Sequence, residues 1–153
     1  MAITIQKTFD VEQPPEDVWA FLVDPERVVD CLPGAKLLEE VDERTYRGEM
    51  GMKLGPIGVT FTGTIRFDRL DEEALEVEMS GEGKDEKGSG SVKMHMESRL
   101  EPLDDGGTRV SVAQSINLSG RLASFGRGGI VQNVADFMFG RFTSCVTKKL
   151  AEG

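Results

Sequence analysis

The feature that most constrains the fold is a change of hydrophobic period along the chain. From about residue 35 to residue 120, apolar and polar residues alternate with a period of two, in segments separated by short polar turns. Only the last segment, from about residue 130 onward, repeats apolar residues every three or four positions, as an amphipathic helix does. A set of antiparallel strands with one apolar face needs a cover for that face, and this helix is the element long enough to supply it.

The N-terminal part of the sequence predicts one strand and two short helices. Residues 3–11 alternate as a strand does, and Pro14-Pro15 followed by two acidic residues is typical of a helix start. Pro25 opens a second short helix, which Pro33-Gly34 ends. We therefore predict a single α+β domain over residues 1–153: a curved antiparallel sheet of about seven strands around a long C-terminal helix, with two short helices after the first strand. This is the helix-grip arrangement.

Composition limits the classes of partner. The chain has 153 residues and a formal net charge of −9, and such an acidic surface repels nucleic-acid phosphates and anionic lipid. No apolar run approaches the roughly 18 residues that a membrane-spanning helix needs, and the N-terminus lacks a signal-peptide core. We expect a cytoplasmic protein that binds no nucleic acid. Cys31 and Cys145 lie far apart among apolar residues and are predicted to be buried free thiols, as in a reducing compartment.

The inward positions of the predicted strands mix glycine with methionine. Glycine lets a strand bend and leaves volume unfilled, and methionine fills irregular space, whereas a solid core favours leucine, isoleucine and valine. One interpretation is a cavity with soft apolar walls between sheet and helix; the other is a solid core whose glycines serve only sheet curvature. The residues in this register are Gly48, Gly63, Gly81, Gly83 and Gly90, with Met50, Met52, Met79, Met94 and Met96.

We favour the cavity and predict its lining. Gln114 and Ser98 are the inward polar side chains, and each could bond a ligand carbonyl or a neighbouring backbone group. No charged residue falls on the inward face of predicted strands three to seven. Gly126, Gly128 and Gly129 predict a break that serves as the hinge of a gate, with the regular helix starting near Ile130. The predicted ligand-binding residues are Met50, Met52, Phe61, Ile65, Met79, Met94, Met96, Val112, Gln114, Ile116, Val134, Met138 and Phe142.

Catalytic and metal-binding patterns are sparse. His95, the only histidine, falls in the outward register, so a Cys–His nucleophile pair is not expected. One histidine and two distant cysteines do not make a zinc site of the usual type, and no motif implies a cofactor. The "GRGG" stretch at 126–129 lacks the Lys-Ser/Thr ending of a phosphate-binding loop. These patterns favour a binding protein with no catalytic residues.

Three stretches resemble a known family. They are "PPEDVWAFLVDPERVVDCLPGAK" (14–36), "YRGEMGMKLGPI" (46–57) with "FTGTIRF" (61–67), and "GRLASFGRGGI" (120–130). The order of elements resembles the START-like (SRPBCC) superfamily, and these stretches resemble the carbon monoxide dehydrogenase G-subunit (CoxG) family within it. The resemblance covers nearly the whole chain. It implies a helix-grip fold and an accessory role beside a molybdenum hydroxylase of the carbon monoxide dehydrogenase type, in assembly, membrane recruitment or electron delivery.

The resemblance and the predicted cavity lead to one hypothesis. An apolar pocket with one or two hydrogen-bonding groups suits a quinone or another lipid-like molecule, carried between an enzyme and the inner membrane during transient contact. Two alternatives stay open. A cyclase-like or hydratase-like enzyme of the same superfamily would need an acid or base turned inward, such as Asp136 or Arg141 on the last helix. A protein-binding chaperone without ligand would show a collapsed core and an exposed apolar patch.

Overall fold

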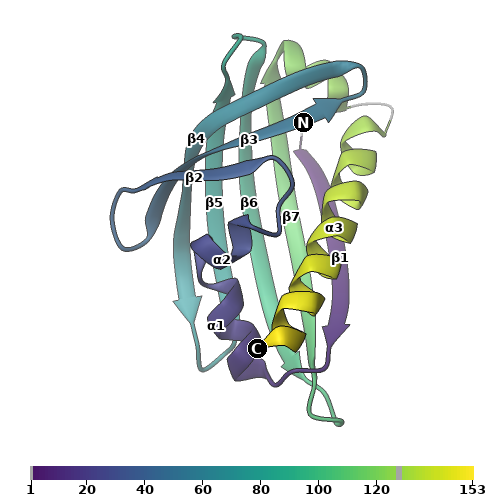
Figure 1. Cartoon of the computed structure of the whole chain (residues 1–153). Coiled ribbons are helices and arrows are strands. Elements are labelled where there is room, and N and C mark those ends of the chain that lie inside the picture. The colour runs from purple at the N-terminus through teal and green to yellow at the C-terminus, as the bar shows by residue number, and fades with distance from the viewer. Residues whose placement is uncertain (1, 127–128) are drawn as a thin grey trace.

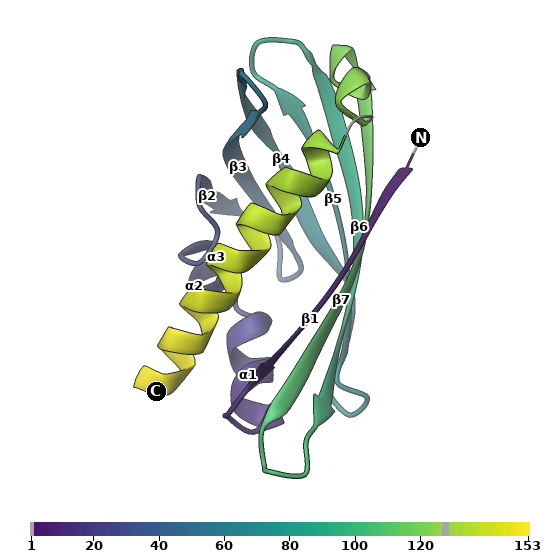
Figure 2. The same cartoon turned by 90° about the vertical axis from the view of Figure 1, so that its right-hand side faces the viewer.

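The computed structural model describes residues 2–126 and 129–153, which form one curved sheet and the helices that cover it (Figure 1). The seven strands pair antiparallel in the order β1-β7-β6-β5-β4-β3-β2. The last helix lies across the concave face of the sheet, beside β1 in both views (Figure 2). The elements are β1 (Ala2–Val11), α1 (Pro15–Leu22), α2 (Pro25–Val29), β2 (Ala35–Glu40), β3 (Thr45–Leu54), β4 (Ile57–Asp71), β5 (Glu76–Asp85), β6 (Gly90–Pro102), β7 (Thr108–Gly120), the 3₁₀ helix η1 (Arg121–Gly126) and α3 (Ile130–Glu152).

The local signals that predicted these elements act as expected. Pro15 is the first residue of α1, and Pro25 opens α2, where the Asp24 side chain accepts a hydrogen bond from the Glu26 backbone N–H. Gly55 adopts a positive φ of 65° in the turn between β3 and β4. The regular part of α3 starts at Ile130, as predicted. The prediction of a curved seven-stranded antiparallel sheet with a C-terminal helix and two short helices is confirmed.

Strand pairing keeps the two predicted faces apart. Met50 lies opposite Phe61, and Gly48 opposite Gly63, so inward residues pair with inward residues. The same holds across the centre of the sheet, where Met96 lies opposite both Met79 and Gln114. The period of two therefore carries from strand to strand, and the inward face is continuous from β3 to β1.

A row of three glycines crosses the sheet where β3, β4 and β5 bend. Gly63 lies opposite Gly48 on one side and Gly83 on the other. A Cβ on Gly63 would lie 1.8 Å from the carbonyl oxygen of Glu82, and one on Gly48 would lie 2.8 Å from that of Lys36. Backbone of the neighbouring strand occupies the space of a side chain at both positions, so the curvature that was predicted for these glycines is real.

The structure corrects the prediction of free cysteines. Cys31 and Cys145 form a disulfide with their Cα atoms 5.4 Å apart, although 114 positions separate them in sequence. Cys31 follows α2 and is 3% exposed, and Cys145 lies on the face of α3 that packs over the same core. The fold brings them together because α3 returns to the end of the molecule where α2 lies (Figure 1).

Candidate functional site: the concave face beneath α3

The apolar interior is divided into two clusters. The lower cluster lies between α1, the C-terminal half of α3 and the lower half of the sheet in Figure 1, and it contains Trp19, Phe67 and Val146. The upper cluster lies near the turn between β3 and β4 and contains Leu54, Phe61 and Leu122. Each cluster is built around leucine, valine and aromatic residues that are less than 9% exposed, as a solid core is.

Between the clusters lies a half-buried band of the concave face. We call it the central band and define it by those predicted ligand-binding residues that belong to neither cluster. Ile65 is 41% exposed despite its inward register. Gly81 also lies in this stretch, and a Cβ there would lie 3.5 Å from Met94 and 3.6 Å from Ile65. The central band consists of Met50, Ile65, Met94, Met96, Gln114, Ile116 and Met138.

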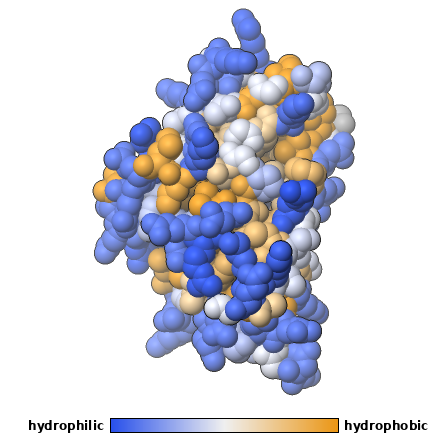
Figure 3. Space-filling model, in the orientation of Figure 1, coloured by the Kyte–Doolittle hydropathy of each residue, from blue (hydrophilic) through white to orange (hydrophobic). Residues whose placement is uncertain are grey.

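Helix α3 spans both clusters and the band between them. Val134, Met138 and Phe142 are spaced by four residues and so lie on one face of the helix. Val134 packs against the upper cluster and Phe142 against the lower one, while Met138 belongs to neither. Figure 3 shows hydrophobic atoms exposed in the centre of this face of the molecule and near the start of α3. The methionines therefore gather where the interior is least closed.

The thirteen predicted ligand-binding residues divide among these three regions. All ten from the sheet lie in the inward register. Met52, Phe61 and Val134 pack in the upper cluster, and Met79, Val112 and Phe142 pack against the lower one. The remaining seven make up the central band. The six that pack in the clusters lie at the two ends of this band.

The inward face carries two charged groups that the sequence analysis did not place there. Lys7 on β1 lies opposite Val112, and its ammonium pairs with the carboxylate of Asp136 on α3. Asp85, the last residue of β5, is 6% exposed. Asp85 was predicted to lie in the turn after the fifth strand, but β5 runs one residue beyond Lys84 and so brings this charged group to the inward end of the strand. The alternation of β1 was the signal for Lys7, because Ile5 and Phe9 flank it in the same register.

Both charged groups already have partners. Asp85 accepts hydrogen bonds from the Ser89 hydroxyl and from the Thr60 backbone N–H at 3.2 Å. The Ser89 hydroxyl, which is the main cause, holds the pKa of Asp85 below its ordinary value. Asp136 is tied to Lys7, and Arg141 lies over the exposed Phe137 ring with its guanidinium carbon 5.9 Å from the ring centroid. Among the described residues, no carboxylate or amine thus stands free in the central band.

The predicted hinge is only partly described. Gly126 is the last residue of η1, and Gly129 precedes α3 with a φ of 78°, a conformation that glycine adopts readily. Gly128 lies outside the described residues. The start of α3 approaches the hairpin of β3 and β4, where a Cβ on Gly55 would lie 3.8 Å from Ile130.

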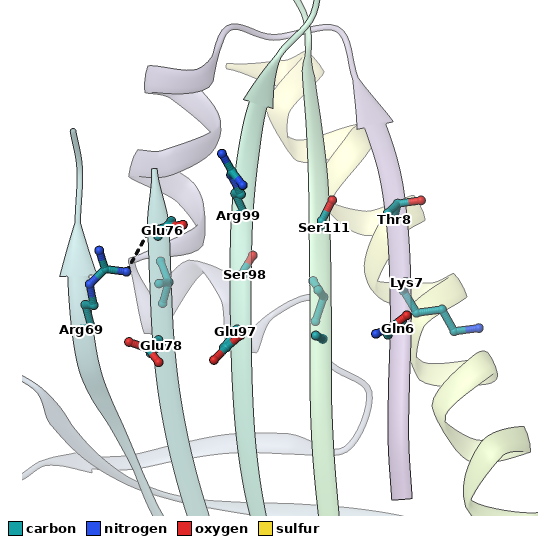
Figure 4. Close-up of a pocket in the computed structure, with 13 residues that line it drawn as sticks. Gln6, Lys7, Thr8, Arg69, Glu76, Glu78, Glu97, Ser98, Arg99 and Ser111 are labelled. Carbon is teal, nitrogen blue, oxygen red and sulfur yellow. Dashed lines mark hydrogen bonds and ion pairs between the residues drawn. The ribbon is translucent and has the colours of Figure 1, made fainter. Parts of the chain in front are cut away.

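The outer face of the sheet carries a separate polar depression. Its volume is about 610 Å³, and its lining includes Gln6, Arg69, Glu97 and Ser111 (Figure 4). Of the predicted ligand-binding residues it includes only Val112. His95 is half exposed on this face, as predicted. The depression is open and polar, so it does not correspond to the apolar site that the sequence predicted.

A curved antiparallel sheet that grips a C-terminal helix defines a START-like helix-grip domain, and solved structures share this fold. A conserved protein from Geobacillus kaustophilus superposes with a TM-score of 0.85 at 20% identity, over 98% of this chain and 96% of that one. The Zhui aromatase/cyclase from Streptomyces sp. R1128 gives 0.71 at 16% identity, over 99% and 94%. A START superfamily protein from Mycobacterium smegmatis gives 0.66 at 12% identity, over 97% of each.

The sequence identifies the family more narrowly than the fold does. The chain belongs to the carbon monoxide dehydrogenase G-subunit (CoxG) family, whose profile matches residues 8–151. A comparison with curated protein sequences gave no match. Within the described residues, no helix has both the length and the hydrophobicity that crossing a membrane requires.

Proposed function

We propose that this protein is a non-catalytic accessory protein that binds a lipid-like or quinone-like molecule on the central band. The observation that carries the proposal is the division of the interior into two solid clusters with a half-buried band of methionine and isoleucine between them. A protein that needed only a stable core would gain by joining the clusters. Flexible methionine side chains between the two clusters can adapt to ligands of different shape.

The energetics of such binding are favourable. A ligand that buries about 300 Å² of apolar surface gains roughly 7 kcal/mol from burial, before the cost of its lost freedom. Gln114 is the polar member of the central band, and its side-chain amide can donate to a ligand carbonyl. In this proposal the N-terminal end of α3 moves as the gate about Gly126 and Gly129, while the Cys31–Cys145 disulfide holds the C-terminal half of the helix in place.

Family membership supports the proposed partner. We infer that the chain serves a molybdenum hydroxylase of the carbon monoxide dehydrogenase type, by assembly, membrane recruitment or delivery of an electron carrier. Delivery fits the central band best, because an apolar carrier would be shielded from water between the membrane and the enzyme. In this proposal the protein works in the cytoplasm and makes transient contact with the inner membrane.

Two other functions remain as alternatives with specific support. The structural similarity to an aromatase/cyclase motivates the alternative of a cyclase-like enzyme. At 16% identity, this similarity concerns the fold and not the activity. A cyclase also needs a free acid or base in its site. In the described part of the concave face, the candidate Asp136 is not free, because its carboxylate pairs with Lys7. A protein-binding chaperone is supported by the exposed Leu38 and Val41, which are 43% and 54% exposed at the edge strand and its end.

Substitution of Met94 by tryptophan tests the proposal. Met94 is central in the band, opposite Gly81 and Ile116, so a larger ring would fill the proposed site. If the ligand and the tryptophan ring compete for the same space, the binding free energy should become less favourable by about 1–3 kcal/mol, the usual cost of overpacking. This corresponds to a loss of affinity of roughly 5- to 150-fold. The protein is incubated with vesicles that contain an isoprenoid quinone, reisolated and extracted, and the quinone is quantified by mass spectrometry.

The matched control is Lys93→Trp, which places the same ring on the outward face of the same strand. We expect Lys93→Trp to load as the wild type does and Met94→Trp to lose loading while its circular dichroism is unchanged. Equal loading of the two folded variants would refute a site on the central band.

A further inference from the structure

The outer face of the sheet brings three metal-ligating side chains together. Glu78 on β5 lies directly opposite Glu97 on β6, and His95 precedes Glu97 by two residues in the same register. Figure 4 shows Glu78 and Glu97 side by side on neighbouring strands. One ligand atom from each of the three residues lies within 4.8 Å of the other two.

The two carboxylates are poorly compensated where they stand. Like charges directly opposite each other on neighbouring strands are destabilising. Arg69 on β4 lies opposite Glu78, but its guanidinium is held by Asp71 and Glu76 at 2.9 Å and 2.8 Å. Among the described residues, the two glutamates make one contact with a basic side chain, between His95 Nε2 and Glu97 Oε1 at 3.6 Å. This arrangement leaves a negative site with an imidazole at its edge.

We propose that Glu78, His95 and Glu97 bind a divalent transition-metal ion of the zinc class. One imidazole nitrogen with two carboxylate oxygens is a borderline donor set, which suits Zn²⁺ or Co²⁺ better than Mg²⁺ or Ca²⁺, which prefer all-oxygen sites. Tetrahedral Zn²⁺ separates its ligand atoms by about 3.3 Å. The 3.6 Å contact is already close to that value, and side-chain rotation of the half-buried Glu78 brings the third ligand in.

The surroundings leave room for a further ligand on the metal. Three protein ligands leave at least one position open on tetrahedral zinc. Glu78 and Glu97 line the 610 Å³ depression, together with the Ser111 hydroxyl and the Arg99 guanidinium (Figure 4). Because two of the three ligands line a depression that also offers donors for an anionic group, we infer that a small anion or a carboxylate would complete the coordination.

This site is independent of the proposed ligand site. Glu78 and Glu97 point to the outer face, whereas their strand neighbours Met79 and Met96 point to the concave face. The prediction that no zinc site is present rested on cysteine and histidine as ligands and did not cover a site with two glutamates. The available signal was Glu78 and the His95-x-Glu97 pair in the outward registers of two neighbouring strands.

The experiment uses the untagged protein, because His95 is then the only histidine. Its imidazole gives one set of ring resonances in NMR, which need no further assignment. Zn²⁺ is titrated while these resonances and the binding heat are followed, and Co²⁺ absorption reports the coordination geometry. We expect saturable binding of one ion per chain, a shift of the His95 ring signals and a rise in Tm of several degrees in excess Zn²⁺.

Three variants separate this site from nonspecific binding to an acidic surface. His95→Ala and Glu78→Gln each remove one proposed ligand, and we expect affinity to fall roughly tenfold or more in both. Glu82→Gln removes the same charge from the same face of β5, where Glu82 lies opposite Lys93. We expect it to bind as the wild type does. An unchanged His95 spectrum in excess Zn²⁺, or equal affinity in all three variants, would overturn the proposal.

Discussion

Removing the Cys31–Cys145 disulfide should cost a large part of the protein's stability. The bond closes a loop of 114 residues. In the chain-entropy model the closure lowers the entropy of the unfolded chain by about 16 cal/mol/K, which is about 5 kcal/mol at 25 °C. Because the free energy of unfolding of an ordinary domain is about 5–15 kcal/mol, reduction should remove about a third or more of it and move the urea midpoint far down. The lower cluster around Cys31 still holds α3 through Val146 and Leu150.

The assay is urea unfolding with and without reductant, followed by the fluorescence of Trp19. This is the only tryptophan, and it is 7% exposed within the lower cluster. A Cys31→Ala/Cys145→Ala variant is the control. Its urea midpoint should match that of the reduced wild type and should not change when reductant is added. Because Cys31 is buried, free thiols are labelled in urea-unfolded protein, which should give none before reduction and two after it. Two labelled thiols before reduction, or coincident oxidised and reduced curves, would refute the reasoning.

Two further predictions concern the sheet. Gly63→Ala places a Cβ 1.8 Å from a carbonyl oxygen, whereas Gly58→Ala meets nothing within 4 Å, so chemical unfolding should show a loss of about 2 kcal/mol or more for the first variant and little for the second. Equal midpoints would contradict the backbone contact. Because the pKa of Asp85 is lowered by folding, chiefly through the Ser89 hydroxyl, its contribution is fully present above the unfolded value of about 3.9 and is lost as pH falls through the folded value. Asp85→Asn should therefore flatten the fall in unfolding free energy in acid, and an unchanged pH dependence would contradict this.

The fold could be predicted because its signals are local. The alternation through Met50, Met52 and Phe61 sets which side chains share a face, and antiparallel pairing preserves that choice from strand to strand. Pro25 and Gly55 mark a helix start and a turn by chemistry that depends on their own backbones. The division of the interior into two clusters was not predicted, because it depends on where α3 crosses the sheet.

Features that depend on pairing between distant segments escaped the sequence analysis. The partner of Cys31 is decided by the return path of α3, and neither cysteine's neighbours in sequence report it. Glu78 and Glu97 meet because one hairpin register places them opposite each other, and a shift by one residue would separate them. The inward placement of Lys7 follows a local alternation and was within reach of the sequence, since Ile5 and Phe9 share its face.

Extraction of the purified protein with organic solvent, followed by mass spectrometry, tests the central claim most directly. The claim is that the concave face beneath α3 carries an apolar ligand. We predict a stoichiometric isoprenoid, quinone or fatty acid in the extract of wild-type protein reisolated from membranes, and its depletion in Met94→Trp. An empty extract after incubation with membranes would contradict the claim and favour a role in binding other proteins.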